Sequence, residues 1–434
     1  MSAMGAMTDQ VLAVPSQGGV GVWWWWAFIP SAALTLLLAA AIGWLFYRGV
    51  GVWGIGYPVA WGFAIINYVW WIGIASGGTF ISAFFFLLRA EWRASLSRIA
   101  ETMTLFAAAC AAIYPILHLG RPWLFYWLLP YPDSMGLWPQ FRSPLLWDFY
   151  AIVTYVIGSL LFWYFGMIPD LASLRDAARG RARRLIFALL SLGFRGSARQ
   201  WRDYHASYGV LAAVMAPLVI SVHSIVGLDF AGGQTPGWHS THFPPFFVFG
   251  AVLSGFAMVL LLTVPLRRLL GFEAYITDRH FDVLARLLLT SSLCIAYAYA
   301  IEAFFVFYGG EAAERSQFLD RLRGTVYWGT ILCNVLAPQF FWSRRLRLRP
   351  TWLVGVSLLV LAGMWLERFG IVVAVLRHTR IPSAWGGYHP SFWDWATFLG
   401  TIGLFCMGIL LFLRFLPALS MFETRELLAK GRRA

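Results

Sequence analysis

The sequence contains few cysteines, and none of them is placed to hold a redox centre. Cys110, Cys294, Cys333 and Cys406 are isolated from one another within apolar stretches. They form no Cys-x-x-Cys pair of the kind that binds zinc or an iron–sulfur cluster, and no Cys-x-x-Cys-His motif for covalent haem. Most of the eight histidines lie near loops, so paired axial haem ligands at matching depth are not expected either. We therefore predict a chain without intrinsic haem or iron–sulfur cluster.

Charged residues are also scarce. They make up 12% of the 434 residues, whereas 60% are hydrophobic and 18% aromatic. Soluble globular domains contain about 25% charged residues, so this composition excludes that class and predicts an integral membrane protein. Residues 1–22 lack the basic start and the small-residue cleavage site of a signal peptide, so we expect the first apolar segment to be retained as a span.

Apolar stretches of about 20 residues, the length that crosses a hydrocarbon layer of about 30 Å, occur along the whole chain. The predicted fold is an all-α integral membrane protein with about ten transmembrane helices, arranged as two four-helix bundles plus two flanking helices. The predicted spans are 27–47, 58–88, 99–119, 144–169, 205–226, 243–266, 283–308, 325–343, 351–369 and 393–416.

The domain division that we expect follows this grouping. Residues 1–57 would form an N-terminal segment with the first flanking helix, and 58–226 the first four-helix bundle, including a basic loop at 170–204. Residues 227–369 would form the second bundle, and 370–434 an outer loop, the last flanking helix and the tail.

The net charge of +13 comes mainly from basic residues in the loops between the predicted spans. Lys and Arg concentrate in the C-terminal tail and in the loops that join the second span to the third, the fourth to the fifth, the sixth to the seventh and the eighth to the ninth. Membrane proteins place basic residues in their cytoplasmic loops, so both termini are predicted to be cytoplasmic. The densest arginine cluster, from Arg175 to Arg202, is interpreted as a signal for topology and for contact with lipid. No aromatic-interleaved soluble module accompanies it, so no nucleic-acid partner is expected.

Two ionisable residues lie near one membrane surface on either side of one loop. His118 ends the apolar run 105–119, and Asp148 follows Ser143-Pro144, which offers a helix cap and a first-turn proline. A charged carboxyl in a span costs roughly 2.5–3.5 kcal/mol on the insertion scale, so its presence indicates protons, ions or a polar ligand. His118 and a desolvated Asp148 could form a proton relay. The structural alternative is that Asp148 only pairs with Arg121 or Arg142.

Other polar residues give weaker signals. Glu302, which we place in mid-span, is a candidate for a proton path or an internal salt bridge, and His223 lies at the outer end of its span. His239 and His242 are spaced as an i, i+3 pair, but no third ligand is evident, so no metal site is expected.

Longer stretches resemble the NrfD/PsrC family of quinone-interacting membrane subunits. Residues 58–73 read Pro-Val-Ala-Trp-Gly-Phe-Ala-Ile-Ile-Asn-Tyr-Val-Trp-Trp-Ile-Gly, and residues 117–123 read Leu-His-Leu-Gly-Arg-Pro-Trp. The resemblance continues through 221–230 and 236–241. With ten predicted spans, the chain looks most like the ActC-type subunits of bacterial alternative complex III.

This resemblance implies a quinol-oxidising subunit of a respiratory or photosynthetic complex in the bacterial inner membrane, with possible proton translocation. Menaquinol or ubiquinol would bind near the periplasmic side. Electrons would pass to a docked iron–sulfur subunit and then to c-type haem subunits, beside a second NrfD-like membrane subunit and lipids.

The same resemblance implies roles for particular residues. His118 and Asp148 would bind quinol and accept protons, while Glu302 and His223 remain the candidates for a proton path. The residues expected to support the pocket are Arg121, Asn67, Ser76, Asp229 and Arg368. Ser76 stands where the family pattern has a histidine, and a serine cannot take up a proton near neutral pH.

Three other readings remain open at this stage. The nearest is an NrfD-type anchor of a molybdopterin enzyme such as polysulfide reductase. A secondary transporter would use Glu302 as its coupling carboxylate at a midplane site. A structural scaffold would use Asp148 and Glu302 only in salt bridges.

Overall fold

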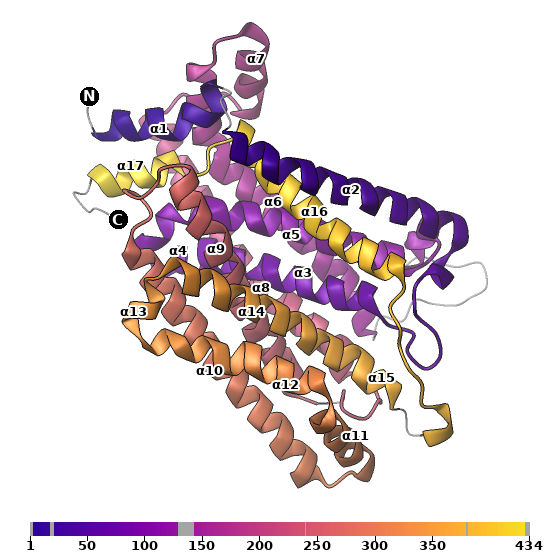
Figure 1. Cartoon of the computed structure of the whole chain (residues 1–434). Helices are drawn as coiled ribbons and strands as arrows, with labels where there is room; N and C mark the ends of the chain where they lie inside the picture. Colours follow the sequence, from indigo (N-terminus) through magenta and orange to yellow (C-terminus); the bar gives the residue numbers. More distant parts are fainter. Residues whose placement is uncertain (1–2, 18–20, 129–142, 239, 379–380, 430–434) are drawn as a thin grey trace.

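The computed structural model describes residues 3–17, 21–128, 143–238, 240–378 and 381–429, and within these ranges it contains helices and no strand (Figure 1). Nine of the described helices are long and apolar enough to cross a membrane. They are α2 (Val22–Arg48), α3 with its continuation (Phe63–Leu87), α5 (Ser97–His118), α6 (Pro144–Ala177), α8 (Ala198–Ala231), α9 (Phe243–Leu269), α10 (Asp278–Gly309), α14 with its continuation (Pro350–Arg377) and α16 (Phe392–Phe415). The prediction of an all-α, multi-pass membrane protein is confirmed.

Shorter helices connect the spans or lie at their ends. The α-helical ones are α1 (Ala3–Gln17), α4 (Phe85–Leu87), α7 (Arg181–Leu190), α11 (Ala312–Arg323), α13 (Arg344–Arg347), α15 (Val375–Arg377) and α17 (Met421–Ala429). Two π-helical segments, η2 (Phe80–Phe84) and η7 (Gly370–Ala374), continue α3 and α14. Five segments are 3₁₀ helices: η1 (Val50–Val52), η3 (Glu91–Ser95), η4 (Pro122–Leu128), η6 (Ala337–Trp342) and η8 (Pro382–Ala384).

The segment predicted as the span 325–343 differs from a regular helix. It consists of α12 (Thr325–Ile331), a π-helical segment η5 (Leu332–Leu336) and η6. Pro338 has no backbone N–H to bond the carbonyl of Asn334, four residues earlier. That carbonyl instead accepts a hydrogen bond from the Ser292 hydroxyl of α10 at 2.6 Å. The proline therefore interrupts the helix, and the neighbouring helix satisfies the freed carbonyl.

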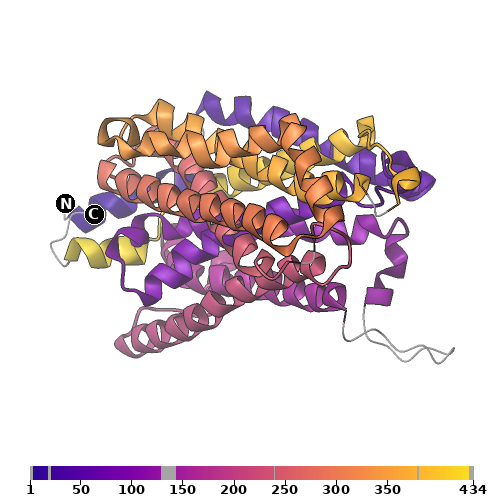
Figure 2. The same ribbon diagram turned by 90° about the horizontal axis from the view of Figure 1, so that it is seen from below.

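The spans pack with α3 and α9 at the centre. α3 contacts α5 and α9, α6 contacts α5 and α8, and α9 contacts α8, α10 and α14. α2 and α16 lie side by side along one edge, as Figures 1 and 2 show. α9 contacts both α3 and α8, and the division into two four-helix bundles stays a prediction.

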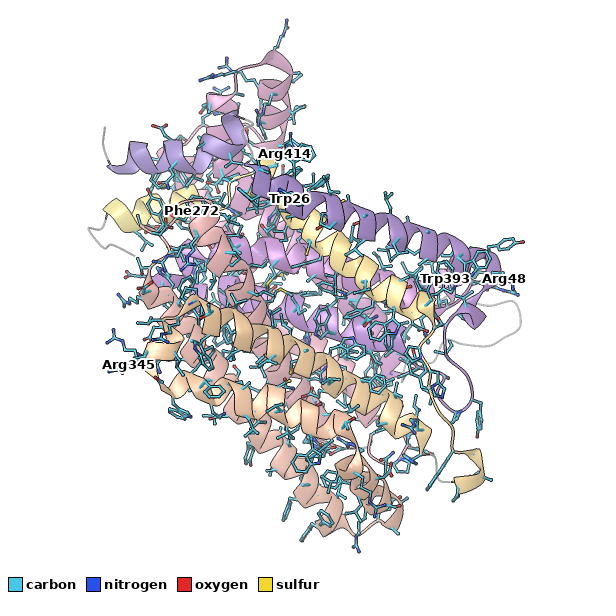
Figure 3. All side chains as sticks on the ribbon, in the orientation of Figure 1. Trp26, Arg48, Phe272, Arg345, Trp393 and Arg414 are labelled. Atoms are coloured by element: carbon cyan, nitrogen blue, oxygen red, sulfur yellow. The ribbon has the colours of Figure 1, made fainter. Side chains whose placement is uncertain are left out.

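Aromatic and arginine side chains mark both ends of the α2–α16 pair (Figure 3). At one end the guanidinium of Arg414 lies 4.8 Å from the centre of the Trp24 ring, close to exposed Trp26. At the other end Arg48 lies 5.6 Å from the Trp44 ring, which stacks on Trp393. Such pairs are typical of the two water interfaces of a membrane span.

The described terminal helices lie together at one end of the molecule (Figure 1). Arg425 of α17 donates a hydrogen bond to the Thr8 hydroxyl of α1 at 2.7 Å. Both terminal helices therefore lie at the same end of the bundle. That this end faces the cytoplasm stays a prediction.

Close backbone packing joins α3 to α9. A Cβ added to Gly77 would lie 2.1 Å from the Cα of Gly255, and one added to Gly78 would lie 2.4 Å from the Ala100 carbonyl oxygen of α5. Small residues of this kind let membrane helices approach each other closely. The Gly77–Gly255 crossing thus sets the distance between the two central helices.

We expect Gly77→Ala and Gly255→Ala each to destabilise the protein by about 1–3 kcal/mol or more, because the added methyl overlaps backbone atoms that cannot move aside cheaply. Thermal unfolding of the purified protein in detergent would measure the loss. Gly355→Ala is the matched control, because a Cβ at Gly355 meets no atom within 4 Å. Equal melting temperatures for all three variants would contradict the packing argument.

Candidate functional site

A cavity of about 220 Å³ lies at the end of the molecule opposite α1 and α17, where α5 and α8 end and α6 begins. Its polar lining residues are His118, Asp148, Asp229 and Tyr68. The remaining wall is apolar or aromatic and includes Trp61 and Phe230. The structure thus brings together three of the residues predicted from the sequence, from three different helices.

Local sequence explains how Asp148 and His118 reach this cavity. Ser143 is the N-cap residue of α6 and Pro144 its first residue, which places Asp148 one turn into the helix. His118 is the last residue of α5, and Gly120 turns the chain away at a φ of +70°. That conformation favours glycine, and a Cβ there would also lie 2.6 Å from a methyl group of Val50.

Asp148 is held by a tyrosine. Its side chain is buried, with the residue 8% exposed, and its Oδ2 accepts a hydrogen bond from the Tyr68 hydroxyl at 2.6 Å. Its other oxygen, Oδ1, has no hydrogen-bond partner among the described residues. The structure thus joins Asp148 to Tyr68 rather than to Arg121, while Arg142 lies outside the described residues.

Two further polar atoms of this cavity lining also lack partners in the described part of the chain. They are Nδ1 of His118 and Oδ1 of Asp229. A buried polar atom without a hydrogen bond costs about 1–3 kcal/mol, so native structures rarely keep several together unless something else satisfies them. Three such atoms in residues that line one cavity indicate a ligand with several hydrogen-bonding groups.

The aromatic part of the wall suits a flat ligand. Trp61 stacks on Trp238 with ring centres 5.6 Å apart and meets the rings of Phe230 and His118 edge-on at 6.0 and 6.5 Å. The indole N–H of Trp238 is bonded to the Ile371 carbonyl at 2.7 Å, so this stack is anchored to η7. Rigid aromatic surfaces with a few polar groups are typical of sites for small ring compounds.

Three other residues predicted for the pocket lie elsewhere. Arg121 is exposed and does not line the cavity. Asn67 is buried, and its side-chain oxygen accepts a hydrogen bond from the Trp365 indole at 2.8 Å. Ser76 is buried eight residues after Tyr68 on α3, about 12 Å along the helix. Its hydroxyl has no partner among the described residues.

Arg368 and His223 are buried in the interior. Arg368 forms an ion pair with Glu367 and lies 4.2 Å from the centre of the Phe247 ring. The absence of a side chain at Gly250 makes room for it, since a Cβ there would lie 2.8 Å from its guanidinium. Neither ring nitrogen of His223 has a partner among the described residues. Neither Arg368 nor His223 lines the first cavity.

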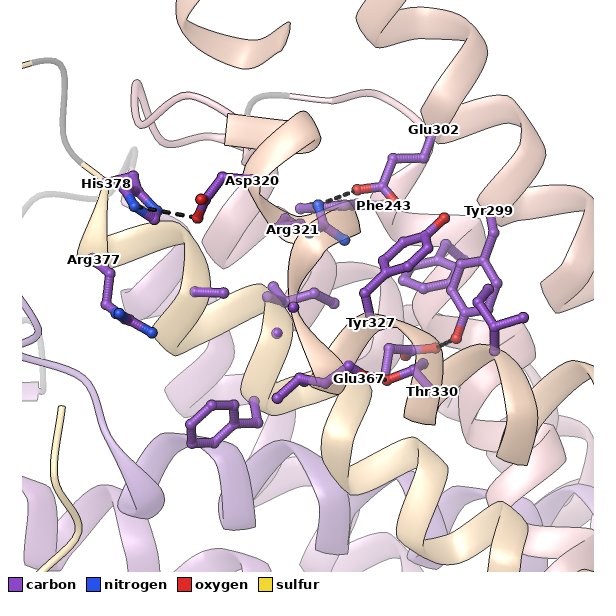
Figure 4. Close-up of a pocket in the computed structure, with 18 residues that line it drawn as sticks. Phe243, Tyr299, Glu302, Asp320, Arg321, Tyr327, Thr330, Glu367, Arg377 and His378 are labelled. Carbon is purple, nitrogen blue, oxygen red and sulfur yellow. Dashed lines mark hydrogen bonds and ion pairs between the residues drawn. The ribbon is translucent and has the colours of Figure 1, made fainter. Parts of the chain in front are cut away.

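A second cavity, of about 120 Å³, lies between α9, α10, α12 and α14 and is lined by charged residues (Figure 4). Glu302 accepts a hydrogen bond from Arg321 at 2.6 Å, and Asp320 lies 3.3 Å from His378. Glu367 bonds both Tyr299 and Arg368. Each carboxylate that lines this cavity is therefore already paired with a neighbour.

Glu302 lies closer to the membrane surface than predicted. It is seven residues before the end of α10, and its partner Arg321 belongs to the connecting helix α11. Glu302 therefore forms an internal salt bridge, which is one of the two roles that we predicted for it. Its role in a proton path stays a prediction.

Sequence analysis missed two buried groups. Tyr68 belongs to the motif at 58–73 but was given no predicted role. The available signal was its place directly after Asn67, which was predicted to support the pocket. Arg98, Glu101 and Asp170 form a buried cluster in which Arg98 donates to Glu101 at 3.1 Å and to Asp170 at 2.8 Å. Arg98 and Asp170 each lie one residue outside a predicted span, which is why their burial was not expected.

Metal binding has no support in the described part of the chain, where no group of three or more His, Cys, Asp or Glu residues could hold an ion. His242 lies 2.5 Å from the Ser240 hydroxyl. His239, its partner in the i, i+3 pair, lies outside the described residues.

These features define a multi-pass membrane protein with a buried, incompletely satisfied polar cavity near one surface. The model for the polysulphide reductase NrfD family matches residues 51–378, about three quarters of the chain, and the protein belongs to this family.

Two curated relatives are similar to the chain. A putative membrane subunit of dimethyl sulfoxide reductase from Halobacterium salinarum is 27% identical over 419 residues, covering 88% of this chain and 90% of its own. One of the subunits of selenate reductase from Mesobacillus selenatarsenatis is 22% identical over 210 residues, covering 47% of each chain.

The bond between Tyr68 and Asp148 can be tested without knowledge of the ligand. In a double-mutant cycle of Tyr68→Phe and Asp148→Ala, we expect a coupling free energy of about 1–3 kcal/mol, the range for a buried hydrogen bond to an acidic group. Thermal unfolding in detergent provides the measurement. Tyr164→Phe with Asp148→Ala is the control cycle, since Tyr164 bonds the Leu190 carbonyl instead. Equal coupling in both cycles would argue against the bond.

Proposed function

We propose that this protein is the membrane anchor of a multi-subunit oxidoreductase, most similar to the anchors of molybdopterin enzymes such as polysulfide reductase, and that it oxidises quinol in the cavity around Asp148. The family and the names of both relatives, which are subunits of reductases, support this reading. A reductase consumes electrons, so its membrane anchor would draw them from quinol.

The observation that carries the proposal is the set of unpaired polar atoms in the cavity lining. Quinol is a flat ring with a hydroxyl at each end, and its oxidation releases two electrons and two protons. We assign one hydroxyl to Asp148 Oδ1 and the other to His118 Nδ1, both of which lack partners in the described structure. A carboxylate and an imidazole are suited to accept these protons.

Tyr68 and Asp229 would complete the proton chemistry. The Tyr68 hydroxyl bonds Oδ2 of Asp148 and so leaves Oδ1 for the substrate. Asp229 lines the same cavity and is the proposed next acceptor for a proton that leaves Asp148. Trp61 would contact the face of the ring, and the apolar wall would exclude water from it.

Of the other predicted residues, we propose only indirect roles. Asn67, Ser76 and Arg368 would shape the interior around the site rather than touch quinol, and Arg121 would face a partner protein. Glu302 and His223 remain proposals for a proton path toward the second cavity, which His223 does not line.

The electrons would leave through a partner protein. An iron–sulfur subunit docked at the cavity end is the proposed acceptor, and exposed Trp123 and Phe125 of η4 offer it an aromatic surface directly after α5. In our proposal this end faces the outside of the cytoplasmic membrane and both termini face the cytoplasm. The alternative complex III reading, with c-type haem subunits and a second NrfD-like subunit, has no support in the names of these relatives.

The decisive variant is Asp148→Asn, which preserves shape and removes the proton acceptor. In the purified complex we expect quinol-dependent reduction of the redox centres to fall by about 10²-fold or more, the usual loss for an acid–base group. The rate would be followed by absorbance after mixing with menaquinol or ubiquinol analogues, with equal amounts of each complex. Asp320→Asn serves as the matched carboxylate control, because Asp320 lines the second cavity and has no proposed role in proton transfer.

Each outcome of this experiment has a clear meaning. Loss of activity in Asp148→Asn with an intact complex supports the site and is incompatible with a pure scaffold. A wild-type rate in Asp148→Asn would overturn the site assignment. Loss in Asp320→Asn alone would move the site to the second cavity.

A further inference from the structure

We propose that α7 and the residues on either side of it form a binding surface for anionic lipid headgroups at the membrane interface. This inference does not depend on the quinol site, which lies at the other end of the molecule. It rests on the shape, charge and position of the connection between α6 and α8.

One face of α7 is apolar and uncovered. Leu185, Ile186 and Leu189 are 59%, 54% and 68% exposed, and Leu192 just after the helix is 68% exposed. At 100° per residue the first three fall on one side of the helix, away from buried Phe187. A set of large apolar side chains that faces away from the protein requires an apolar partner.

The rest of this segment is strongly basic. Residues 178–201 contain six arginines, at 179, 181, 183, 184, 195 and 199, and no aspartate or glutamate. Arg181 and Arg184 are exposed on α7 and lie along one edge of the apolar side. A short helix with an apolar face beside arginines is the pattern of helices that lie in the headgroup layer of an anionic membrane.

The fold holds α7 at the level of the membrane surface. α6 and α8 are both membrane spans, so the connection between them cannot move far from the interface. Figure 1 shows α7 standing off from the bundle at the end that carries α1 and the start of α2. Phe187 is buried, and the Tyr164 hydroxyl of α6 donates to the Leu190 carbonyl at 2.8 Å, which fixes the C-terminal end of α7 to α6.

The apolar face of α7 continues a surface that lipid would cover. Leu160 and Leu161 of α6 are 46% and 51% exposed, and they lie one turn before Tyr164. If the acyl chains of the bilayer cover this part of α6, the lipid headgroups lie at the level of α7. Charge complementarity selects anionic lipid rather than neutral lipid, because only phosphate-bearing headgroups with a net negative charge balance the arginines.

The test places an environment-sensitive fluorophore on Leu189→Cys in the purified protein, and the parent protein treated with the same dye gives the background from the native cysteines. The labelled protein is reconstituted in nanodiscs of phosphatidylcholine with increasing fractions of phosphatidylglycerol. We expect a blue shift that grows with phosphatidylglycerol and weakens in high salt, because screening shortens the reach of the arginines.

A charge variant and a matched control test the arginines. Arg181→Gln with Arg184→Gln should weaken the apparent affinity for phosphatidylglycerol by roughly 25-fold, about fivefold for each arginine. Arg344→Gln with Arg345→Gln, two exposed arginines of α13, should leave it unchanged. Both pairs are exposed, so neither should disturb folding.

Three outcomes would overturn the proposal. The first is an equal shift in phosphatidylcholine and in phosphatidylglycerol nanodiscs, which would mean burial in any bilayer without headgroup selection. The second is an equal loss of affinity in both arginine pairs, which would mean a non-specific charge effect. The third is a label that stays in water in every nanodisc and is shielded only in the assembled complex, which would assign this face to a protein partner.

Discussion

The structure depends on one constraint, namely that a polar group in hydrocarbon must find its partner inside the protein. The break in the helix at 325–342 shows how this works. Pro338 frees the carbonyl of Asn334, and Ser292 of the neighbouring helix bonds it. Elsewhere in the interior, the terminal nitrogens of Arg98 donate to Glu101, Asp170 and the Gly166 carbonyl. The close crossing of Gly77 and Gly255 brings the central helices near enough for such pairing to extend across the interior.

The same constraint separates the two cavities. In the cavity between α10 and α14 every lining carboxylate is bonded to an arginine, a histidine or a tyrosine, and Nδ1 of His378 is the buried lining atom that lacks a partner among the described residues. In the cavity around Asp148, His118, Asp148 and Asp229 each keep one atom unpaired among the described residues. A paired cavity stabilises a fold, whereas an unpaired one is costly unless a ligand completes it. That difference, rather than size or charge, identifies the first cavity as the candidate site.

Sequence reasoning located most of the spans because hydropathy depends on composition alone. It also placed His118 and Asp148 near one surface, because Gly120 and Pro144 are local signals for where helices end and begin. It could not find the bond from Tyr68 to Asp148, which joins residues 80 positions apart and depends on how α3 packs against α6. For the same reason it gave Arg98 and Asp170 no role, since burial by neighbouring helices leaves no trace in a local pattern. Arg121, adjacent in sequence to the site, is exposed.

The position of the cavity also bears on what the protein can do. A transporter of the alternating type needs its site near the midplane, where both surfaces can reach it in turn. Here the unpaired groups lie close to helix ends: His118 closes α5, Asp148 lies in the first turns of α6, and Asp229 in the last turn of α8. A substrate there is close to one surface only, which suits transfer of electrons to a protein docked on that surface. In the buried Arg98 cluster near the opposite surface Nε of Arg98 lacks a partner among the described residues, but the carboxylates of Glu101 and Asp170 are bonded, so their pairing matches the second cavity rather than the candidate site.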